Sequence, residues 1–355
     1  MKVRRLSTRL LLRPEDFAAS RGDFEVVGAF NPGAAQFGDE VTLLVRIAER
    51  PRERRPGFIG LPRFDAESRG MAIDWIAEDE LEFVDPRVVR RRSDGIVRLT
   101  FVSHLRVVRC GAGLEVREIT NIEFGPENEL EEFGVEDPRI MFLDDRYYIT
   151  YVCVSRHGPA TALASTVDFR TFRRHGVLFC PDNKDVVLFP EKIGGSYAAI
   201  HRPVCGTAFT RPEPWIASSP DLIHWGSHEP LVIPEGDVRR GRAGAGAPPI
   251  RVAQGWLEIY HGNIRPTLPG EVGAYYGAAI LLDAEKPARV VKRSSEPFLV
   301  PEADFEVGGF VSNVVFPTGT APAGDVVRVY YGAADAYVAV AEFSEREILN
   351  SLISI

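Results

Sequence analysis

Five segments of the chain share one pattern of apolar and polar positions. Each starts at or beside a turn of Gly or Asp and continues through apolar or aromatic residues, and most end at a polar residue near Gly, Ala or Pro. The segments cover residues 39–49, 144–154, 194–203, 254–263 and 325–335. Short runs of this kind between turn residues indicate β-strands. We predict five equivalent strands, each of which begins a four-stranded sheet from the inside.

A second repeat follows two of these strands. Residues 165–179 and 218–232 both contain a Ser and Asp turn, an aromatic residue four positions after the Asp, and an apolar run. Strand groups that recur at intervals of roughly 40 to 60 residues, without a long helical period, are typical of a propeller. We therefore predict an all-β chain, a five-bladed β-propeller that forms one domain over residues 1–355. Polar strand ends would then meet at the axial mouth and could hold a ligand there.

Three regions depart from the repeat. The interval from Arg46 to Tyr151 is about twice the others, which predicts an insertion in the region of the first and second blades, at about 51–130. Residues 241–250 are rich in Gly and Pro and are interpreted as a lid, a close backbone passage beside a ligand, or a plain loop. A short helix is expected near the C-terminus, at about 344–352.

Composition and charge narrow the class of protein. With 26% charged and 45% hydrophobic residues, the chain has the composition of a globular protein. Its net charge of −8 argues against nucleic acid or an anionic membrane as partner. No apolar run approaches the ~20 residues that span a bilayer, and residues 10–12 are too short a run for a signal peptide, so we expect a cytoplasmic protein. The four cysteines, Cys110, Cys153, Cys180 and Cys205, are expected to be reduced thiols in the core.

The most informative local motif is GVEDPRI, residues 134–140. Adjacent side chains of an extended strand point to opposite faces, so Glu136 and Asp137 are not expected to line the same pocket. One carboxylate would be catalytic and the other structural, paired with Arg139. The motif alone is weak evidence, because Asp before Pro is common where strands begin. Motifs for nucleotide binding, zinc proteases and serine hydrolases are absent from the sequence.

Further motifs accompany this one along the chain. They are FNPGAAQ (30–36), LLVRIAE (43–49), NKDVVLFPEKI (183–193), HRP (201–203), GAGAPPI (244–250), IYHG (259–262), GFVSNVVFPTG (309–319) and YYGAAD (330–335). In these stretches and in their order, the chain resembles glycoside hydrolase family 130, the β-mannoside phosphorylases and their hydrolytic relatives. The resemblance implies a five-bladed propeller with its active site at the axial mouth. It also implies an inverting reaction in which Asp137 is the general acid and delivers its proton through the 3-hydroxyl of mannose.

The resemblance also assigns the binding residues. In phosphorolysis the phosphate itself is the nucleophile, so the site needs cations where an inverting hydrolase needs a second carboxylate as base. The expected phosphate-binding residues are Arg156, Lys184, Arg202, Tyr260 and His261. The hydrolytic relatives lack much of this basic set, which favours phosphorolysis.

Mannose contacts are implied for Asn31, Arg46 and Asp335. Their structural alternatives are an Asx-turn at Asn31 and an ion pair between Arg46 and Asp335. Four aromatic residues either stack on the acceptor sugar or pack in the sheets: Tyr151, Trp225, Trp256 and Tyr276.

Taken together, these features predict an inverting phosphorylase that converts β-mannobiose, a manno-oligosaccharide, or a mannosyl-glucose or mannosyl-N-acetylglucosamine into α-mannose 1-phosphate. Inorganic phosphate is the co-substrate, and no metal or other cofactor is expected. The alternatives are hydrolysis of the same bond, a catalytically silent carbohydrate-binding propeller, and a protein-interaction propeller with a broad apolar or charged rim. Linkage, acceptor and chain length depend on loops such as 51–70 and 234–243, and a homo-oligomer is allowed.

Overall fold

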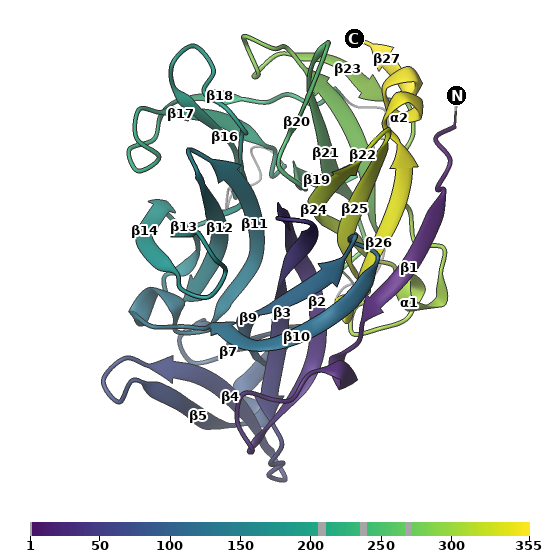
Figure 1. Cartoon of the computed structure of the whole chain (residues 1–355). Coiled ribbons are helices and arrows are strands. Elements are labelled where there is room, and N and C mark those ends of the chain that lie inside the picture. The colour runs from purple at the N-terminus through teal and green to yellow at the C-terminus, as the bar shows by residue number, and fades with distance from the viewer. Residues whose placement is uncertain (1, 205–210, 235–239, 267–271) are drawn as a thin grey trace.

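The computed structural model describes residues 2–204, 211–234, 240–266 and 272–355. Over these residues the chain is built almost wholly of antiparallel strands and turns, in agreement with the predicted all-β class (Figure 1). Turn residues set the hairpins. Asp144 and Asp145, for example, both have positive φ, of 49° and 60°, as the two-residue turn between β11 and β12 requires.

The described strands form five larger sheets and two small ones. The larger sheets comprise β2 (Phe24–Phe37), β3 (Glu40–Pro51), β9 (Val102–Gly111) and β10 (Glu115–Phe124); β11 (Val135–Leu143), β12 (Arg146–Ser155), β13 (Gly158–Thr166) and β14 (Arg173–Phe179); β15 (Asn183–Leu188), β16 (Tyr197–Pro203), β17 (Trp215–Ser219) and β18 (Gly226–Pro230); β19 (Arg240–Ala245), β20 (Ile250–Val252), β21 (Gly255–Ile264), β22 (Tyr275–Leu282), β23 (Val290–Ser294) and β27 (Leu352–Ser354); and β24 (Val315–Ala323), β25 (Val326–Ala333), β26 (Tyr337–Ser344) and β1 (Ser7–Leu12).

Helices are few and short in the described residues. They are α1 (Asp304–Val307), α2 (Glu345–Ser351) and the 3-10 turns η1 (Pro14–Asp16), η2 (Glu78–Glu80) and η3 (Glu129–Glu131). The C-terminal helix α2 lies within the range expected from the sequence. No helix in the described part of the chain is long and apolar enough to cross a membrane.

One edge strand of each larger sheet faces the middle of the molecule. These inner strands are β2, β11, β15, β19 and β24, and contacts join β2 to β11 and β24, β11 to β15, and β15 to β19. The five repeated segments are β3, β12, β16, β21 and β25, so each is the second strand of its sheet. The prediction that they begin the sheets is wrong. The inner strands carry Gly, Pro and polar residues at bulges, which hide their strand pattern in the sequence.

The beginning and the end of the chain meet in one sheet. Strand β1 pairs with β26 in antiparallel fashion, from Ser7 opposite Glu342 to Leu12 opposite Val338. Figure 1 shows β1 along the outer side of β26. Leu12 is fully buried in a core that β3, β9 and β26 share. The outermost strand of this sheet thus comes from the opposite end of the sequence.

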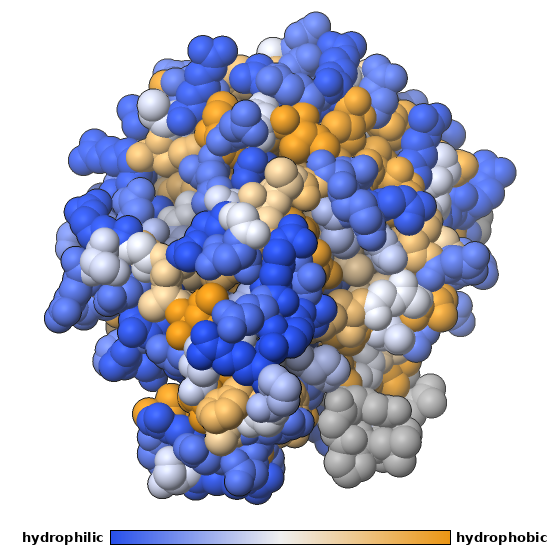
Figure 2. Space-filling model, turned by 90° about the horizontal axis from the view of Figure 1, so that it is seen from below, coloured by the Kyte–Doolittle hydropathy of each residue, from blue (hydrophilic) through white to orange (hydrophobic). Residues whose placement is uncertain are grey.

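The segment between β3 and β9 supplies the two small sheets. They consist of the hairpin β4 (Phe58–Asp65) and β5 (Gly70–Ala77), and of β6 (Leu81–Asp85), β7 (Val88–Arg91) and β8 (Val97–Leu99). In Figure 1 the β4–β5 hairpin extends below the larger sheets. Seen from that side, apolar side chains form separate patches among hydrophilic ones (Figure 2). We call β4 to β8, which lie within residues 58–99, the additional strands. The next two strands, β9 and β10, complete the sheet of β2 and β3.

The cysteines differ in their surroundings. Cys110 and Cys153 are buried, and burial raises the pKa of each thiol to about 12, so both are inert core thiols. Cys180 is exposed, so the prediction of a core position is wrong for it. It follows directly after the buried end of β14, where the chain turns outward. Cys205 lies outside the described residues.

Candidate active site

The inner strands surround a cavity of about 280 Å³. Its walls carry both signs of charge at high density: the cations Arg46, Arg87, Lys184, Arg202 and Arg242, the acids Glu136, Asp137, Asp182, Asp185 and Asp335, and His261. Cavities in which several titratable side chains converge are the preferred sites of binding and catalysis. This cavity is the candidate active site.

Three of its polar side chains project from bulges in the inner strands. Asn31 in β2, Asp137 in β11 and Asp185 in β15 have φ values of 48°, 50° and 56°. At each of them the pairing register with the next strand shifts. Asn and Asp tolerate this left-handed conformation better than most residues, and a bulge redirects a side chain. The motifs NPG, EDP and NKD therefore turn their polar residue toward the cavity.

Glu136 and Asp137 both line the cavity, so the prediction that they face apart is wrong. It assumed an extended strand, and the left-handed φ of Asp137 breaks the alternation. Arg46 connects the two carboxylates: Nη2 donates to Glu136 Oε1 at 2.6 Å and Nη1 to Asp137 Oδ1 at 2.8 Å. Its Nε donates to Ser103 Oγ at 3.1 Å, and its guanidinium lies 4.6 Å from the ring centre of Phe30.

The carboxyl groups of Asp137 and Asp335 have opposite pKa shifts. Burial alone would raise the pKa of Asp137, but the charges of Arg46, Arg139 and Lys184 outweigh it and hold the pKa below its usual value. Burial raises the pKa of Asp335 above its usual value despite Arg87, whose Nη1 lies 3.2 Å from Oδ2. A proton that enters the cavity is therefore held more strongly by Asp335 than by Asp137.

Asp335 has a different ion-pair partner from the one considered in the sequence. The alternative reading paired it with Arg46, whereas the structure pairs it with Arg87, which follows Pro86 in the segment between β6 and β7. Arg87 belongs to a second Asp-Pro-Arg triplet, residues 85–87, that repeats the triplet at 137–139. This repetition was the signal in the sequence that could have identified Arg87 as part of the site.

The wall formed by β15, β16 and β21 carries Lys184, Arg202 and His261. Arg202 Nη1 lies 3.5 Å from His261 Nε2. Lys184 is near enough to Asp137 for its charge to lower the pKa of that carboxyl. Burial and the neighbouring Arg202 lower the pKa of His261 although Asp185 opposes them, so the imidazole is neutral at neutral pH and serves as a hydrogen-bond donor.

A carboxylate, Asp185, lies among these side chains. Its Oδ2 is 2.8 Å from Arg202 Nη1 and 3.3 Å from His261 Nε2, and its Oδ1 is 3.5 Å from Arg139 Nη2. Burial would raise the pKa of Asp185, but Arg202 and His261 lower it far below its usual value. Asp185 is therefore ionised and weakly basic, and its contacts orient Arg202 and His261.

The backbone of β19 passes directly beside this cluster. A Cβ atom at Gly244 would lie 2.2 Å from Asp185 Oδ2 and 2.7 Å from His261 Cε1. Only glycine leaves room for both side chains here. Of the interpretations considered for residues 241–250, the close backbone passage is the one that the structure shows.

Arg139 is almost fully buried and binds the backbone of the inner strands. Its Nη1 donates to the carbonyl of Asp137 at 2.7 Å and its Nε to that of Gly246 at 2.9 Å. The predicted pairing of Arg139 with the second carboxylate of the motif is therefore wrong for Glu136, whose partner is Arg46. Arg139 instead fixes the bulge that presents Asp137.

Two residues expected to bind phosphate lie away from the cavity wall. The side chain of Arg156 is 63% exposed and forms two hydrogen bonds with Glu132, at 2.7 and 2.9 Å. Tyr260 packs in the core with Ile200 and Ala278. Successive side chains of a strand face opposite sides, so the position of His261 in the cavity places Tyr260 on the other face. The structure thus brings together Lys184, Arg202 and His261, and leaves out Arg156 and Tyr260.

The aromatic candidates from the sequence also lie outside the cavity. Tyr151 and Trp256 are buried in cores between sheets, and Trp225 and Tyr276 pack against such cores. The aromatic side chains that do line the cavity are Phe101, Tyr275 and Phe316.

Comparison with known proteins shows to which family the chain belongs. The model of glycoside hydrolase family 130, described as "beta-1,4-mannooligosaccharide phosphorylase", matches residues 76–353. A beta-1,2-mannobiose phosphorylase from Listeria innocua is 38% identical over 357 residues, which cover 99% of each chain. A 1,2-beta-oligomannan phosphorylase from Thermoanaerobacter is 35% identical over 252 residues, 70% of this chain and 81% of that one. The chain belongs to glycoside hydrolase family 130.

Solved structures agree with the family. The structure of the Listeria innocua beta-1,2-mannobiose phosphorylase in complex with beta-1,2-mannobiose has a TM-score of 0.89 and 37% identity, and the match covers 96% of both chains. A structure from the work on family 130 hydrolases that target beta-1,2 mannosidic linkages in Candida mannan has a TM-score of 0.71 at 21% identity, and the match covers 98% of this chain and 94% of that one, which is a likeness of fold alone.

Proposed function

We propose that this chain catalyses the inverting phosphorolysis of β-mannosides and releases α-mannose 1-phosphate. The observation that carries the proposal is that one cavity holds both a candidate acid and candidate phosphate-binding side chains. Asp137 lies there with its partners Arg46 and Asn31, and Lys184, Arg202 and His261 line the same cavity. The full-length similarity to a beta-1,2-mannobiose phosphorylase supports a β-1,2-linked mannoside as the first substrate to test.

In the proposed mechanism, mannose binds to Asn31, Arg46 and Asp335, and phosphate binds to Lys184, Arg202 and His261. A phosphate oxygen attacks the anomeric carbon while the bond from that carbon to the leaving sugar breaks. The leaving oxygen receives a proton that originates on Asp137 and passes through the mannose 3-hydroxyl. Phosphate is already a nucleophile, so no base is needed, and a set of cations supplies its binding energy.

Hydrolysis is the second candidate, because Asp185 places another carboxylate in the cavity that holds Asp137. An inverting hydrolase uses such a group to activate water. The contacts of Asp185 with Arg202, His261 and Arg139 argue against that role, since they stabilise its ionised form and weaken it as a base. They support a role in which Asp185 holds the phosphate-binding side chains in position.

Phosphate dependence decides between the two reactions. The purified chain is incubated with β-1,2-mannobiose, with and without phosphate, and the products are separated. Phosphorolysis yields α-mannose 1-phosphate only with phosphate. Release of mannose at equal rates in both samples would support hydrolysis. The reverse reaction, α-mannose 1-phosphate with a panel of acceptor sugars, should release phosphate and identify the acceptor.

We further infer that residues 1–355 form one domain, a five-bladed propeller, with the active site at its axial mouth. Five inner strands that contact one another, and a β1 strand that joins the sheet of β24 to β26, support this architecture. We also propose that phosphate is the only co-substrate, with no metal or organic cofactor, so dialysis against EDTA should leave the rate unchanged. A cytoplasmic location suits the charged product, which does not cross membranes.

A further inference from the structure

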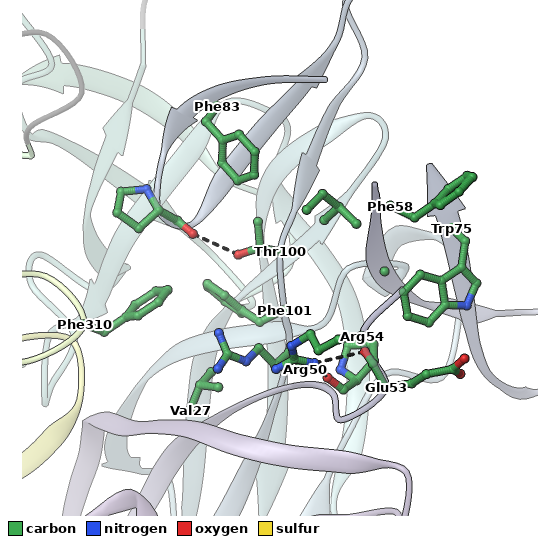
Figure 3. A pocket seen from close by; sticks show the side chains of 14 residues that line it. Val27, Arg50, Glu53, Arg54, Phe58, Trp75, Phe83, Thr100, Phe101 and Phe310 are labelled. Atoms are coloured by element: carbon green, nitrogen blue, oxygen red, sulfur yellow. Dashed lines mark hydrogen bonds between the residues drawn. The ribbon is translucent and has the colours of Figure 1, made fainter. Parts of the chain in front are cut away.

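A second cavity, of about 200 Å³, lies between the additional strands and the sheet of β2 and β3. We call it the insertion groove. Its aromatic lining consists of Phe58, Trp75, Phe83, Phe101 and Phe310. In Figure 3, Phe58 and Trp75 lie on one flank and Phe310 on the other, with Phe101 and Thr100 between them. The mechanism proposed above gives this groove no role.

The insertion groove adjoins the active-site cavity. Phe101 lines both, and its ring lies 5.5 Å from the guanidinium carbon of Arg46, which binds Asp137. On the groove side, the ring of Phe101 meets that of Phe310 edge to face at 6.0 Å. Pro86 lines the groove, and its neighbour Arg87 lines the cavity and pairs with Asp335. One short stretch of chain therefore separates the two spaces.

The groove is built by different strands from those that carry the phosphate-binding side chains. This step rests on the proposed function. In an inverting displacement the nucleophile and the leaving group occupy opposite faces of the anomeric carbon. The side chains proposed to hold phosphate come from β15, β16 and β21, whereas the groove is formed around β2, β3 and the strands that follow β3. We therefore expect a sugar chain that leaves on the face away from phosphate to extend toward the groove.

The lining has the chemistry of a carbohydrate site. The C–H faces of a pyranose are apolar and pack on aromatic rings, while its hydroxyls need hydrogen-bonding groups at the edge. Phe83 and Phe58 are 51% and 46% exposed, which is unusual for phenylalanine and leaves ring faces free for a ligand. Arg50, Glu53 and Arg54 supply the polar edge of the groove.

Trp75 lines the groove between Arg55 and Gly60. Arg55 covers its ring at 4.2 Å, and Gly60 lies close enough that a Cβ atom there would be 3.0 Å from the ring. The absence of a side chain at Gly60 keeps the groove open beside Trp75, because Gly60 lines the groove as well.

We propose that the insertion groove binds the sugar units of an oligomannoside that follow the acceptor residue. The substrate class would then be a mannoside chain of three or more units, with the disaccharide as its shortest member. The aromatic rings bind sugar faces, and the charged edge binds hydroxyls. This inference goes beyond the bond that is cleaved and specifies which length of chain is cleaved best.

The test compares chain lengths in phosphorolysis. We expect kcat/KM of the unaltered protein to increase from the disaccharide to the tetrasaccharide. Phe58→Ala and Phe83→Ala should each reduce kcat/KM for the tetrasaccharide by about threefold to tenfold, the range of an aromatic contact, and leave that for the disaccharide unchanged. Both side chains are substantially exposed, so the variants should fold.

Phe142→Ala is the matched control. Phe142 is 51% exposed, as is Phe83, but it lies on β11 and packs on Tyr147. Phe142→Ala should leave kcat/KM unchanged for both the disaccharide and the tetrasaccharide. If the ratio of tetrasaccharide to disaccharide activity does not change in Phe58→Ala and Phe83→Ala, the inference is overturned while the proposed function stands. If no mannoside of any length yields mannose 1-phosphate, the proposed function itself fails.

A second copy of the chain is the other occupant that the insertion groove could take, and the oligomeric state tells it apart from a carbohydrate. Exposed aromatic rings also pack against second copies of a chain. Sedimentation velocity of the unaltered protein and of Phe83→Ala should give the same species. A smaller species for Phe83→Ala alone would show that a second copy covers the groove, and would overturn the assignment to carbohydrate.

Discussion

At the residue scale, the site depends on three polar residues in left-handed conformation. Asn31, Asp137 and Asp185 each interrupt an inner strand, and each turns a carboxylate or amide into the cavity. The sequence identified Asn31 and Asp137 because their motifs resemble those of a family. It assigned Glu136 to the wrong face, because alternation along a strand cannot anticipate a bulge.

The role of Asp137 can be tested by changing its acidity alone. Asp137→Asn should reduce kcat for β-1,2-mannobiose by about a hundredfold to ten-thousandfold, the contribution of general acid catalysis. Asn also adopts positive φ, so the backbone should be retained. A mannoside with a dinitrophenol leaving group needs no proton and should lose far less activity. Equal losses for both substrates, measured by initial rates, would contradict the assignment.

Asp137 must also gain a proton, although Arg46, Arg139 and Lys184 lower its pKa. An anion bound by Lys184 offsets that positive charge and raises the pKa of Asp137, so anion binding and protonation should favour each other. We expect sulfate to bind with net proton uptake in the acidic range and more tightly as the pH falls.

Calorimetry in two buffers of different ionisation enthalpy measures this uptake. Asp137→Asn removes the titrating carboxyl and should abolish it. The same uptake in Asp137→Asn would place the proton on another group, such as Asp335, and would contradict the coupling.

At the scale of elements, the active site is assembled by neighbouring strands that approach one another very closely. The five repeated strands could be recognised in the sequence, since their apolar runs between turns are regular. The inner strands beside them could not, because residues 30–33, 136–139 and 184–187 shift register. Long-range ion pairs likewise could not be predicted from the sequence. The pairing of Arg87 with Asp335, for example, joins residues 248 positions apart.

Gly244 shows how a strand backbone sets the phosphate site. Gly244→Ala should raise the KM for phosphate at least about tenfold, because the new methyl group displaces Asp185 and His261, a cost of at least about 1.4 kcal/mol. Its φ is not in the left-handed region, so the effect arises from space and not from backbone strain.

Gly226→Ala serves as the control, since Gly226 also lies in a strand and a Cβ atom there would meet nothing within 4 Å. Initial rates against phosphate concentration measure both variants. An unchanged KM in Gly244→Ala would mean that Asp185 and His261 do not shape the phosphate site.

At the scale of the whole molecule, every larger sheet contributes to one cavity. Arg46, Asp137, Lys184 and His261 come from four different sheets, and Asp335 lies in the turn between β25 and β26 of the fifth. The net charge of −8 is therefore no guide to the site, where positive and negative side chains line the same cavity. The sequence predicted strand groups without a long helical period, and the helices of the described residues are short, as expected.

Stability of this arrangement should depend on β1. Leu12→Ala removes a fully buried side chain that packs with Val338 and Val340, and should lower the free energy of unfolding by about 2 to 5 kcal/mol. Leu6→Ala, at a 42% exposed position before β1, should change it by less than about 0.5 kcal/mol. Urea unfolding monitored by circular dichroism compares the two. Equal midpoints would show that β1 does not stabilise the fold.

The pairing of β1 with β26 also has a consequence for biosynthesis. Residues 7–12 emerge from the ribosome early, but their partner, residues 337–344, is made more than 300 positions later. Throughout that interval the backbone N–H and C=O groups of β1 lack their partner strand. Such an unpaired strand can form hydrogen bonds with the strands of other chains and aggregate. The nascent protein is therefore exposed to misassembly at β1 throughout that interval, and it acquires Asp335 and a finished cavity only after β25 has been made.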